Sequence, residues 1–168
     1  MKQIFDQTSF LCSKIVTKKY STSFSLAVKM LVPKIREAIF GIYAFVRFAD
    51  EIVDSFHDFD KNELINEFER DYYKAYDTGI SLNPILNGFQ LTVKKYKIDD
   101  SLIQAFLKSM KLDLNKGQYN TEDEYNDYIY GSADVVGLMC LKVFVEGDIE
   151  KYEQLKSYAM RLVRLFKK

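Results

Sequence analysis

The sequence is poor in the residues that interrupt helices. Its 168 residues include only 2 Pro and 7 Gly. Proline and glycine are the residues that most weaken a helix interior, so their scarcity leaves room for long uninterrupted helices. Apolar residues recur with helical spacing, and no alternating run typical of a strand in a hairpin occurs. The sequence therefore predicts an all-α protein.

Cysteine is also scarce, and long hydrophobic runs are missing. Cys12 and Cys140 are far apart and form no CxxC pair, which argues against a structural zinc site and favours a reducing compartment. Charged residues interrupt every apolar run well short of the roughly 20 residues that a transmembrane helix needs. The first ten residues lack the basic-then-apolar order of a signal peptide. We therefore expect a cytoplasmic protein, with peripheral membrane contact as an open alternative.

An excess of charge of either sign is absent too. The chain has 24 Lys and Arg against 24 Asp and Glu. Because nucleic-acid-binding domains usually carry a basic excess, no nucleic-acid partner is predicted, and no obligate protein partner is evident. Hydrophobic residues are abundant at 48%, with 13 Phe and 12 Tyr. With no linker rich in Pro, Gly or Ser, this composition predicts one helical domain over residues 1–168.

Local signals place the expected helices. Pro33 suits the first turn of a helix, where its missing N–H is not needed. Asp60 is a candidate N-cap, and Thr121 with Glu124 forms a Thr-x-x-Glu capping box. The helices are expected at residues 4–19, 24–31, 33–55, 61–76, 84–96, 100–116, 122–145 and 149–168.

The helix expected at residues 33–55 carries one polar row on an otherwise largely apolar surface. Tyr43, Arg47, Asp50 and Asp54 are spaced by four, three and four residues, which keeps them on one side. Asp50 and Asp54 repel each other by about 0.2–0.5 kcal/mol at this spacing, and a divalent cation would reverse that effect. Arg47 has the planar fork that binds diphosphate oxygens. By itself, an Asp-x-x-x-Asp pair lies on a solvated face more often than in a metal site.

Four segments, in order, resemble motifs of the squalene/phytoene synthase family. Residues 20–24, YSTSF, resemble its (His/Tyr)-Ser-x-Ser-Phe motif, and residues 42–54, IYAFVRFADEIVD, resemble its Tyr-Ala-x-x-Arg-x-x-Asp-x-x-x-Asp helix. Residues 110–114, MKLDL, are similar to Gly-Met-x-x-Asp-Leu, with Ser in place of the Gly. Residues 128–139, YIYGSADVVGLM, resemble Tyr-x-Tyr-x-x-Ala-Gly-x-Val-Gly-x-Met, with Asp134 in place of a Gly. The resemblance covers nearly the whole chain but only the N-terminal part of the family's length.

The resemblance implies an isoprenoid-synthase helical bundle around a central cavity. It further implies a prenyltransferase that condenses two prenyl diphosphates head to head. The leading prediction is a phytoene synthase-like activity on geranylgeranyl diphosphate in carotenoid biosynthesis. The alternatives are squalene or dehydrosqualene formation from farnesyl diphosphate, a non-catalytic helical interaction subunit, and a plain helical bundle.

The resemblance also implies roles for individual residues. Asp50 and Asp54 would bind Mg²⁺, with Mn²⁺ as the alternative, and Arg47 and Tyr43 would contact the diphosphate or support its site. The residues implied to bind or line the substrate site are Ser21, Ser23, Phe24, Arg47, Tyr128, Val136 and Gly137, the glycine allowing close approach to the prenyl chain. Plain core packing is an equal alternative for the aromatic side chains Phe24 and Tyr128 and for Val136.

The family's second acidic motif, Asn-x-x-(Arg)-Asp-x-x-x-Asp, does not occur in the sequence. We therefore expect a truncated domain that lacks the C-terminal helices and has little or no synthase activity by itself. Some relatives have Gly-Ser-Ala-Phe-Gln-Lys just before that motif, and loss of one base there gives the Val-Arg-Leu-Phe-Lys-Lys of residues 163–168. Our hypothesis is a one-base frameshift, as a sequencing error or a gene lesion; a deliberately chosen end is the alternative. Reading the gene onward in the adjacent frame tests it.

Overall fold

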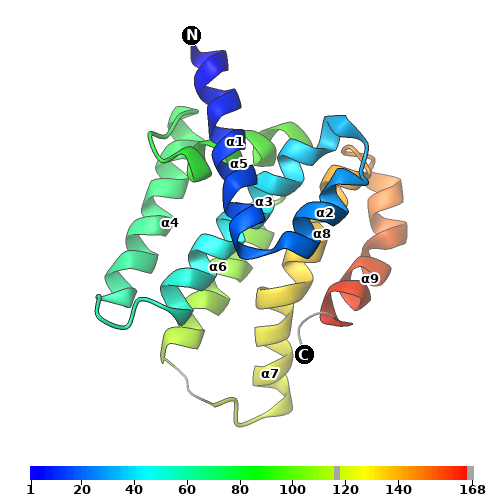
Figure 1. Ribbon diagram of the computed structural model, residues 1–168. Coiled ribbons are helices and arrows are strands. Elements are labelled where there is room, and N and C mark those ends of the chain that lie inside the picture. The colour runs from blue at the N-terminus through cyan, green and yellow to red at the C-terminus, as the bar shows by residue number, and fades with distance from the viewer. Residues whose placement is uncertain (116–117, 166–168) are drawn as a thin grey trace.

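The structure, a computed structural model, describes residues 1–115 and 118–165 and is helical throughout, with no strand in those ranges. The predicted all-α class is therefore confirmed (Figure 1). No helix in the described ranges is long and apolar enough to cross a membrane. The elements are α1 (Lys2–Tyr20), α2 (Thr22–Lys29), α3 (Pro33–Asp54), α4 (Lys61–Thr78), α5 (Pro84–Tyr96), α6 (Asp100–Asn115), α7 (Glu122–Ile129), η1 (Tyr130–Asp134), α8 (Val135–Phe144) and α9 (Ile149–Leu165).

Helix α3 is the centre of the bundle, and it contacts α1, α2, α4, α5, α6 and α8. Phe45, at the middle of α3, is 0% exposed. Its ring lies 3.8 Å from that of Phe89 and 5.1 Å from that of Phe68, centroid to centroid, and both pairs are stacked. Burying each such ring contributes about 1.5–3 kcal/mol. Part of the high aromatic content therefore builds the core around α3.

The N-caps predicted at Asp60 and Thr121 are present in the structure. The side chain of Asp60 accepts a hydrogen bond from the backbone N–H three residues on, at 3.0 Å, and Thr121 does the same at 3.1 Å. Glu124 completes the predicted capping box differently, because its carboxylate accepts from the N–H of Asn120 at 3.1 Å. Ser21 caps α2 at 3.2 Å, so this helix begins two residues before the predicted start.

The helix predicted over residues 122–145 is not one regular α-helix. A π-helical turn, η1, separates α7 from α8. The turn makes two long-range contacts. Helix α6 packs so closely against it that a Cβ on Gly131 would lie 2.7 Å from the carbonyl oxygen of Ala105. Asp134, which is buried, pairs with Arg164 of α9. The wider π-turn places one extra residue between α7 and α8. The last predicted helix is observed as far as residue 165, and its predicted end at residues 166–168 lies outside the described residues.

Helix α1 packs against α3 and α5 through small polar residues. Ser9, Ser13 and Thr17 are buried, and each hydroxyl donates to the carbonyl four residues back, at 3.0, 3.3 and 2.9 Å. Gly41 and Gly88 face α1, where a Cβ on Gly88 would lie 3.4 Å from the Ser13 hydroxyl. Because each hydroxyl is satisfied within α1, this face approaches its neighbours closely without leaving a buried donor unpaired.

Candidate active site

Helix α3 holds the predicted polar row on one side. Tyr43, Arg47 and Asp50 are half-buried, and Asp54, the last residue of the helix, is exposed. Ala44, Phe45 and other neighbours along the helix are fully buried. The row therefore runs from the interior of the bundle outward to solvent, ending in the two carboxylates.

Arg47 is the most constrained member of this row. Its Nη2 forms an ion pair with Glu51, one turn on, and its guanidinium carbon lies 4.7 Å from the centroid of the Tyr20 ring. The hydrogen bond from Arg47 lowers the pKa of the Glu51 carboxyl. The Nε atom of Arg47 is buried and finds no hydrogen-bond partner in the described residues. Such an atom is costly to leave unpaired, so this N–H is a donor suited to an anionic oxygen.

An aromatic corner joins the row to the start of α2. The Phe24 ring stacks on the Tyr43 ring, with centroids 4.8 Å apart and planes at 22°. Burial raises the pKa of the Tyr43 hydroxyl, although the charge of Arg47 and a hydrogen bond with Ser21 act in the opposite direction. Tyr43 therefore stays protonated near neutral pH and can donate a hydrogen bond. Ser23 is exposed, with its hydroxyl 3.5 Å from that of Ser21.

Tyr128 lies where the carboxylates of two helices act together. Burial raises the pKa of its hydroxyl first, followed by the negative charges of Asp113 on α6 and of Asp50 and Asp54 on α3. Its ring stacks on that of Tyr119, with centroids 4.6 Å apart, and the Tyr119 hydroxyl donates to Asp113 at 3.4 Å. Asp113 is the acidic residue of the third motif, but it is not among the residues implied to bind metal or substrate. That motif was the signal that would have found it.

Val136 and Gly137 lie on α8, which also contacts α3. Val136 is half-buried and packs against the hydrophobic core. A Cβ on Gly137 would lie 2.6 Å from Cγ2 of Val163 and 3.1 Å from the carbonyl oxygen of Ala159, both on α9. The glycine therefore permits close packing of α9 on α8. Its predicted role beside a prenyl chain stays a prediction.

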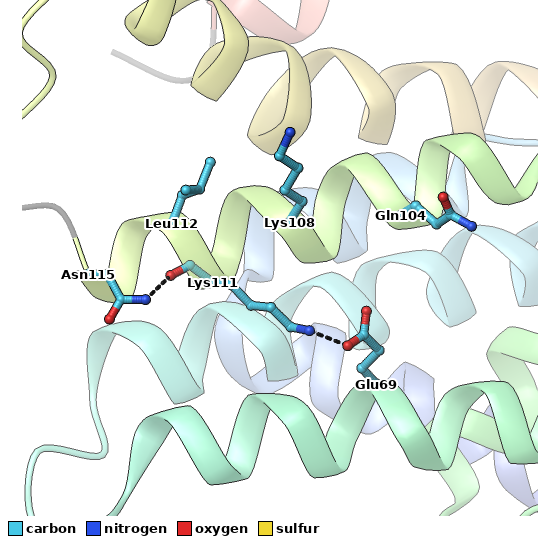
Figure 2. Close-up of a pocket in the computed structure, with 6 residues that line it drawn as sticks. All are labelled: Glu69, Gln104, Lys108, Lys111, Leu112 and Asn115. Carbon is cyan, nitrogen blue, oxygen red and sulfur yellow. Dashed lines mark hydrogen bonds and ion pairs between the residues drawn. The ribbon is translucent and has the colours of Figure 1, made fainter.

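A separate depression of about 280 Å³ lies between α4 and α6. It is lined by Glu69, Gln104, Lys108, Lys111, Leu112 and Asn115. Figure 2 shows Lys108 and Leu112 pointing to one side of α6, whereas Lys111 reaches across to form an ion pair with Glu69. None of the predicted site residues lines this depression, and its polar groups do not converge on one point. It is not the candidate site.

The carboxylates of the row are too few for a metal site made by protein side chains alone, but they suit a magnesium ion that also binds a substrate. In the ranges that the structure describes, no three His, Cys, Asp or Glu side chains are grouped so as to hold a metal ion. Asp50 and Asp54 supply two carboxylates one helical turn apart. Magnesium is commonly held by one or two carboxylates, retained waters and substrate phosphates, without a full protein cage. The donor set therefore fits a magnesium ion shared with a phosphorylated substrate.

A sequence profile described as squalene/phytoene synthase matches residues 17–165, a range that includes all four motifs. The chain belongs to the squalene/phytoene synthase family. This family member is 30% identical over 134 residues to the phytoene synthase of Arthrospira platensis, covering 79% of this chain and 43% of that protein. It is 31% identical over 137 residues to the chloroplastic phytoene synthase 2 of Zea mays, covering 76% of this chain and 32% of that protein.

Solved structures agree with the family assignment at the level of the fold. A dehydrosqualene synthase in complex with a ligand superposes with a TM-score of 0.79 at 22% identity, covering 94% of this chain and 53% of that chain. The squalene synthase HpnC from Alicyclobacillus acidocaldarius also gives 0.79, at 23% identity, with 94% and 59% covered. The predicted isoprenoid-synthase bundle is thereby confirmed. This family member spans just over half the length of these structures and less than half that of the two phytoene synthases.

Proposed function

We propose that this family member supplies one diphosphate-binding half of a prenyltransferase that joins two prenyl diphosphates head to head. The observation that carries the proposal is the row Tyr43, Arg47, Asp50 and Asp54, in which the buried Nε of Arg47 has no partner among the described residues. The similarity to phytoene synthases supports geranylgeranyl diphosphate as substrate and phytoene as product, within carotenoid biosynthesis. Farnesyl diphosphate, converted to squalene or dehydrosqualene, is the second candidate, because the similar folds are of that kind.

Each residue of the row has a proposed role toward the diphosphate. Asp50 and Asp54 would hold Mg²⁺, or Mn²⁺ in its place, and the bound metal would offset the negative charge that develops on the leaving diphosphate. Arg47 would donate from Nε to a diphosphate oxygen while its pair with Glu51 keeps the guanidinium oriented. Tyr43 would donate from its protonated hydroxyl.

The substrate-binding roles of Ser21, Ser23 and Phe24, and of Tyr128, Val136 and Gly137, remain part of this proposal. The hydrogen bond of Ser21 with Tyr43 and the stacking of Phe24 on Tyr43 support the first three as one unit. The negative charge of Asp113 acts on the Tyr128 hydroxyl, so we include the Asp113 carboxylate among the proposed substrate-binding residues.

We also propose that the 168-residue chain has little or no synthase activity by itself. The family's second acidic motif is absent from the sequence, and two carboxylates make an incomplete protein contribution to a metal cluster. A non-catalytic helical subunit is the competing function. A cytoplasmic location, peripheral to a membrane or not, stays a prediction.

Binding to the purified chain, measured by isothermal titration calorimetry, tests the site. The ligands are inorganic diphosphate, farnesyl diphosphate and geranylgeranyl diphosphate, each with and without Mg²⁺. We expect Mg²⁺-dependent binding that falls at least tenfold in Asp50→Asn/Asp54→Asn. Arg47→Gln removes a charge-assisted donor and should weaken binding about 10- to 100-fold. Asp77→Asn, an exposed change on α4, is the matched control.

The outcomes separate the parts of the proposal. If diphosphate binding is the same with and without Mg²⁺ and is unchanged in Asp50→Asn/Asp54→Asn, the proposed metal site is wrong. A folded chain, shown by circular dichroism, that binds no diphosphate would favour the non-catalytic subunit. Product analysis after incubation with either prenyl diphosphate and Mg²⁺ should detect little or no hydrocarbon, and robust turnover would contradict the proposed inactivity.

A further inference from the structure

The C-terminal end of α3, where Asp54 lies, lacks the usual stabilising features of a helix end. Its last turn contains Glu51 and Asp54 and no basic residue. The carbonyl end of a helix carries partial negative charge, so acidic side chains are unfavourable there. The residue after the helix is Ser55 in the right-handed region, with no left-handed glycine cap. The local sequence therefore does little to hold Asp54, one of the two proposed metal ligands, in helical geometry.

Lys61, the first residue of α4, stabilises this end from outside the helix. Its ammonium donates to the carbonyl oxygen of Val53 at 2.6 Å. The last carbonyls of a helix have no partner within it, so a lysine that reaches one of them satisfies an acceptor and offsets the helix dipole. Figure 1 shows the turn of residues 55–60 joining the lower ends of α3 and α4, which brings Lys61 to Val53.

The same turn holds the lysine in place. Nζ of Lys61 also lies 3.0 Å from Nδ1 of His57. An ammonium group can only donate, so Nδ1 is the acceptor of this hydrogen bond. Lys61 is half-buried, whereas His57 is exposed. Two hydrogen bonds thus fix a long side chain beside the last turn of α3.

Lys61 is unfavourably placed for its own helix. It directly follows Asp60, the N-cap of α4, and so lies at the positive end of the dipole of that helix. Acidic residues are the ones that stabilise a first helical turn. A residue that weakens the start of its own helix while supporting the end of its neighbour departs from local consistency, and such departures are expected at functional sites.

We propose that Lys61 is a positioning residue for the metal site. Its hydrogen bond to Val53 holds the last turn of α3 and thereby keeps the Asp54 carboxylate one helical turn from that of Asp50. The inference rests on the proposed diphosphate site. Lys61 is no ligand of the metal, because a cation repels Mg²⁺. Loss of its charge alone would therefore ease Mg²⁺ binding, whereas loss of the positioning would weaken it.

Isothermal titration calorimetry of the purified chain with inorganic diphosphate, at a series of Mg²⁺ concentrations, tests the inference. Lys61→Met keeps the length of the side chain but removes the donor. We expect the Mg²⁺ concentration for half-maximal binding to rise about three- to tenfold, as the loss of one ordering hydrogen bond implies. Lys61→Arg keeps the charge and donors and should stay within about twofold of the unchanged chain. Lys74→Met, an exposed change on the same helix, is the matched control and should have no effect.

Amide hydrogen exchange, resolved by nuclear magnetic resonance, tests the structural step without any ligand. The N–H of Ser55 donates to the carbonyl of Glu51 at 2.9 Å and closes the last turn of α3. In Lys61→Met this amide should exchange about threefold faster or more, because the turn opens more often. In Lys74→Met its exchange should be unchanged.

The outcomes separate this inference from the proposed function. If the unchanged chain binds diphosphate with Mg²⁺ and Lys61→Met leaves the Mg²⁺ requirement the same or lowers it, the positioning role is wrong and the diphosphate site stands. Unchanged exchange at Ser55, or a loss confined to binding without Mg²⁺, would overturn the role as well, the latter by making Lys61 a diphosphate ligand. If the unchanged chain shows no Mg²⁺-dependent binding, the proposed function fails, and the positioning role fails with it.

Discussion

Replacing Arg164 by Met should destabilise the bundle by about 2–3 kcal/mol. The Asp134 carboxylate is 0% exposed and accepts from Nε of Arg164 at 2.7 Å and from Nη2 at 2.5 Å. Methionine keeps most of the apolar length of the side chain and removes both donors. Removing one partner of a fully buried ion pair costs about 3–5 kcal/mol, because the other charge is left uncompensated. The Arg164 side chain is 48% exposed, so in the variant water can donate some of the hydrogen bonds that the Asp134 carboxylate loses. We therefore expect a smaller loss of stability than for a fully buried pair.

Urea unfolding followed by far-ultraviolet circular dichroism at pH 7 measures this loss. A chain of this size should also lose about 5–10 °C in Tm. Arg161→Met is the matched control, since Arg161 is exposed on the same helix, and it should change stability by less than about 0.5 kcal/mol. In Asp134→Gly/Arg164→Met the buried charge is gone, so part of the loss should be recovered. If Arg164→Met unfolds at the same urea concentration as Arg161→Met, the carboxylate does not depend on this pair.

Two further predictions concern the helix contact at η1 and the cysteines. Gly131→Ala should cost about 1–3 kcal/mol, because its Cβ would lie 2.7 Å from a backbone oxygen of α6 that cannot move alone. The looser site at Gly88 should tolerate alanine better in the same urea assay, and the opposite order would contradict the packing account. Both thiols are partly exposed, but the apolar surroundings of Cys140 raise the pKa of its thiol to about 12, so at pH 8 it should react slowly with Ellman's reagent. Cys12→Ser should then remove the faster phase, and an unchanged fast phase would refute this.

The helices were predictable because their signals are local. Asp60 and Thr121 cap the helices that follow them, and each cap involves residues three positions apart. The π-turn at residues 130–134 was not predictable by the same means. It is associated with the packing of Gly131 against α6 and the pair of Asp134 with Arg164, which joins residues 30 positions apart. Sequence periodicity does not predict contacts between residues so far apart in the chain.

The candidate site, too, could be predicted only where it depends on local spacing within one helix. The row on α3 follows from helical spacing alone, so Arg47 and Asp50 could be placed side by side in advance. The pair of Arg47 with Glu51 has i, i+4 spacing and was equally open to prediction. The position of Asp113 beside Tyr128 depends on how α6 meets the segment after residue 118, which no local pattern specifies.

The π-turn also makes the chain sensitive to length at this one place. Each residue of an α-helix turns the chain by about 100°, so deleting one residue from 130–134 and closing the turn as regular helix would rotate α7 by that angle relative to α8. Tyr128 would then turn away from Asp113 and from the carboxylates of α3. Between Tyr128 and Val135, the number of residues is therefore as restrictive as their identity.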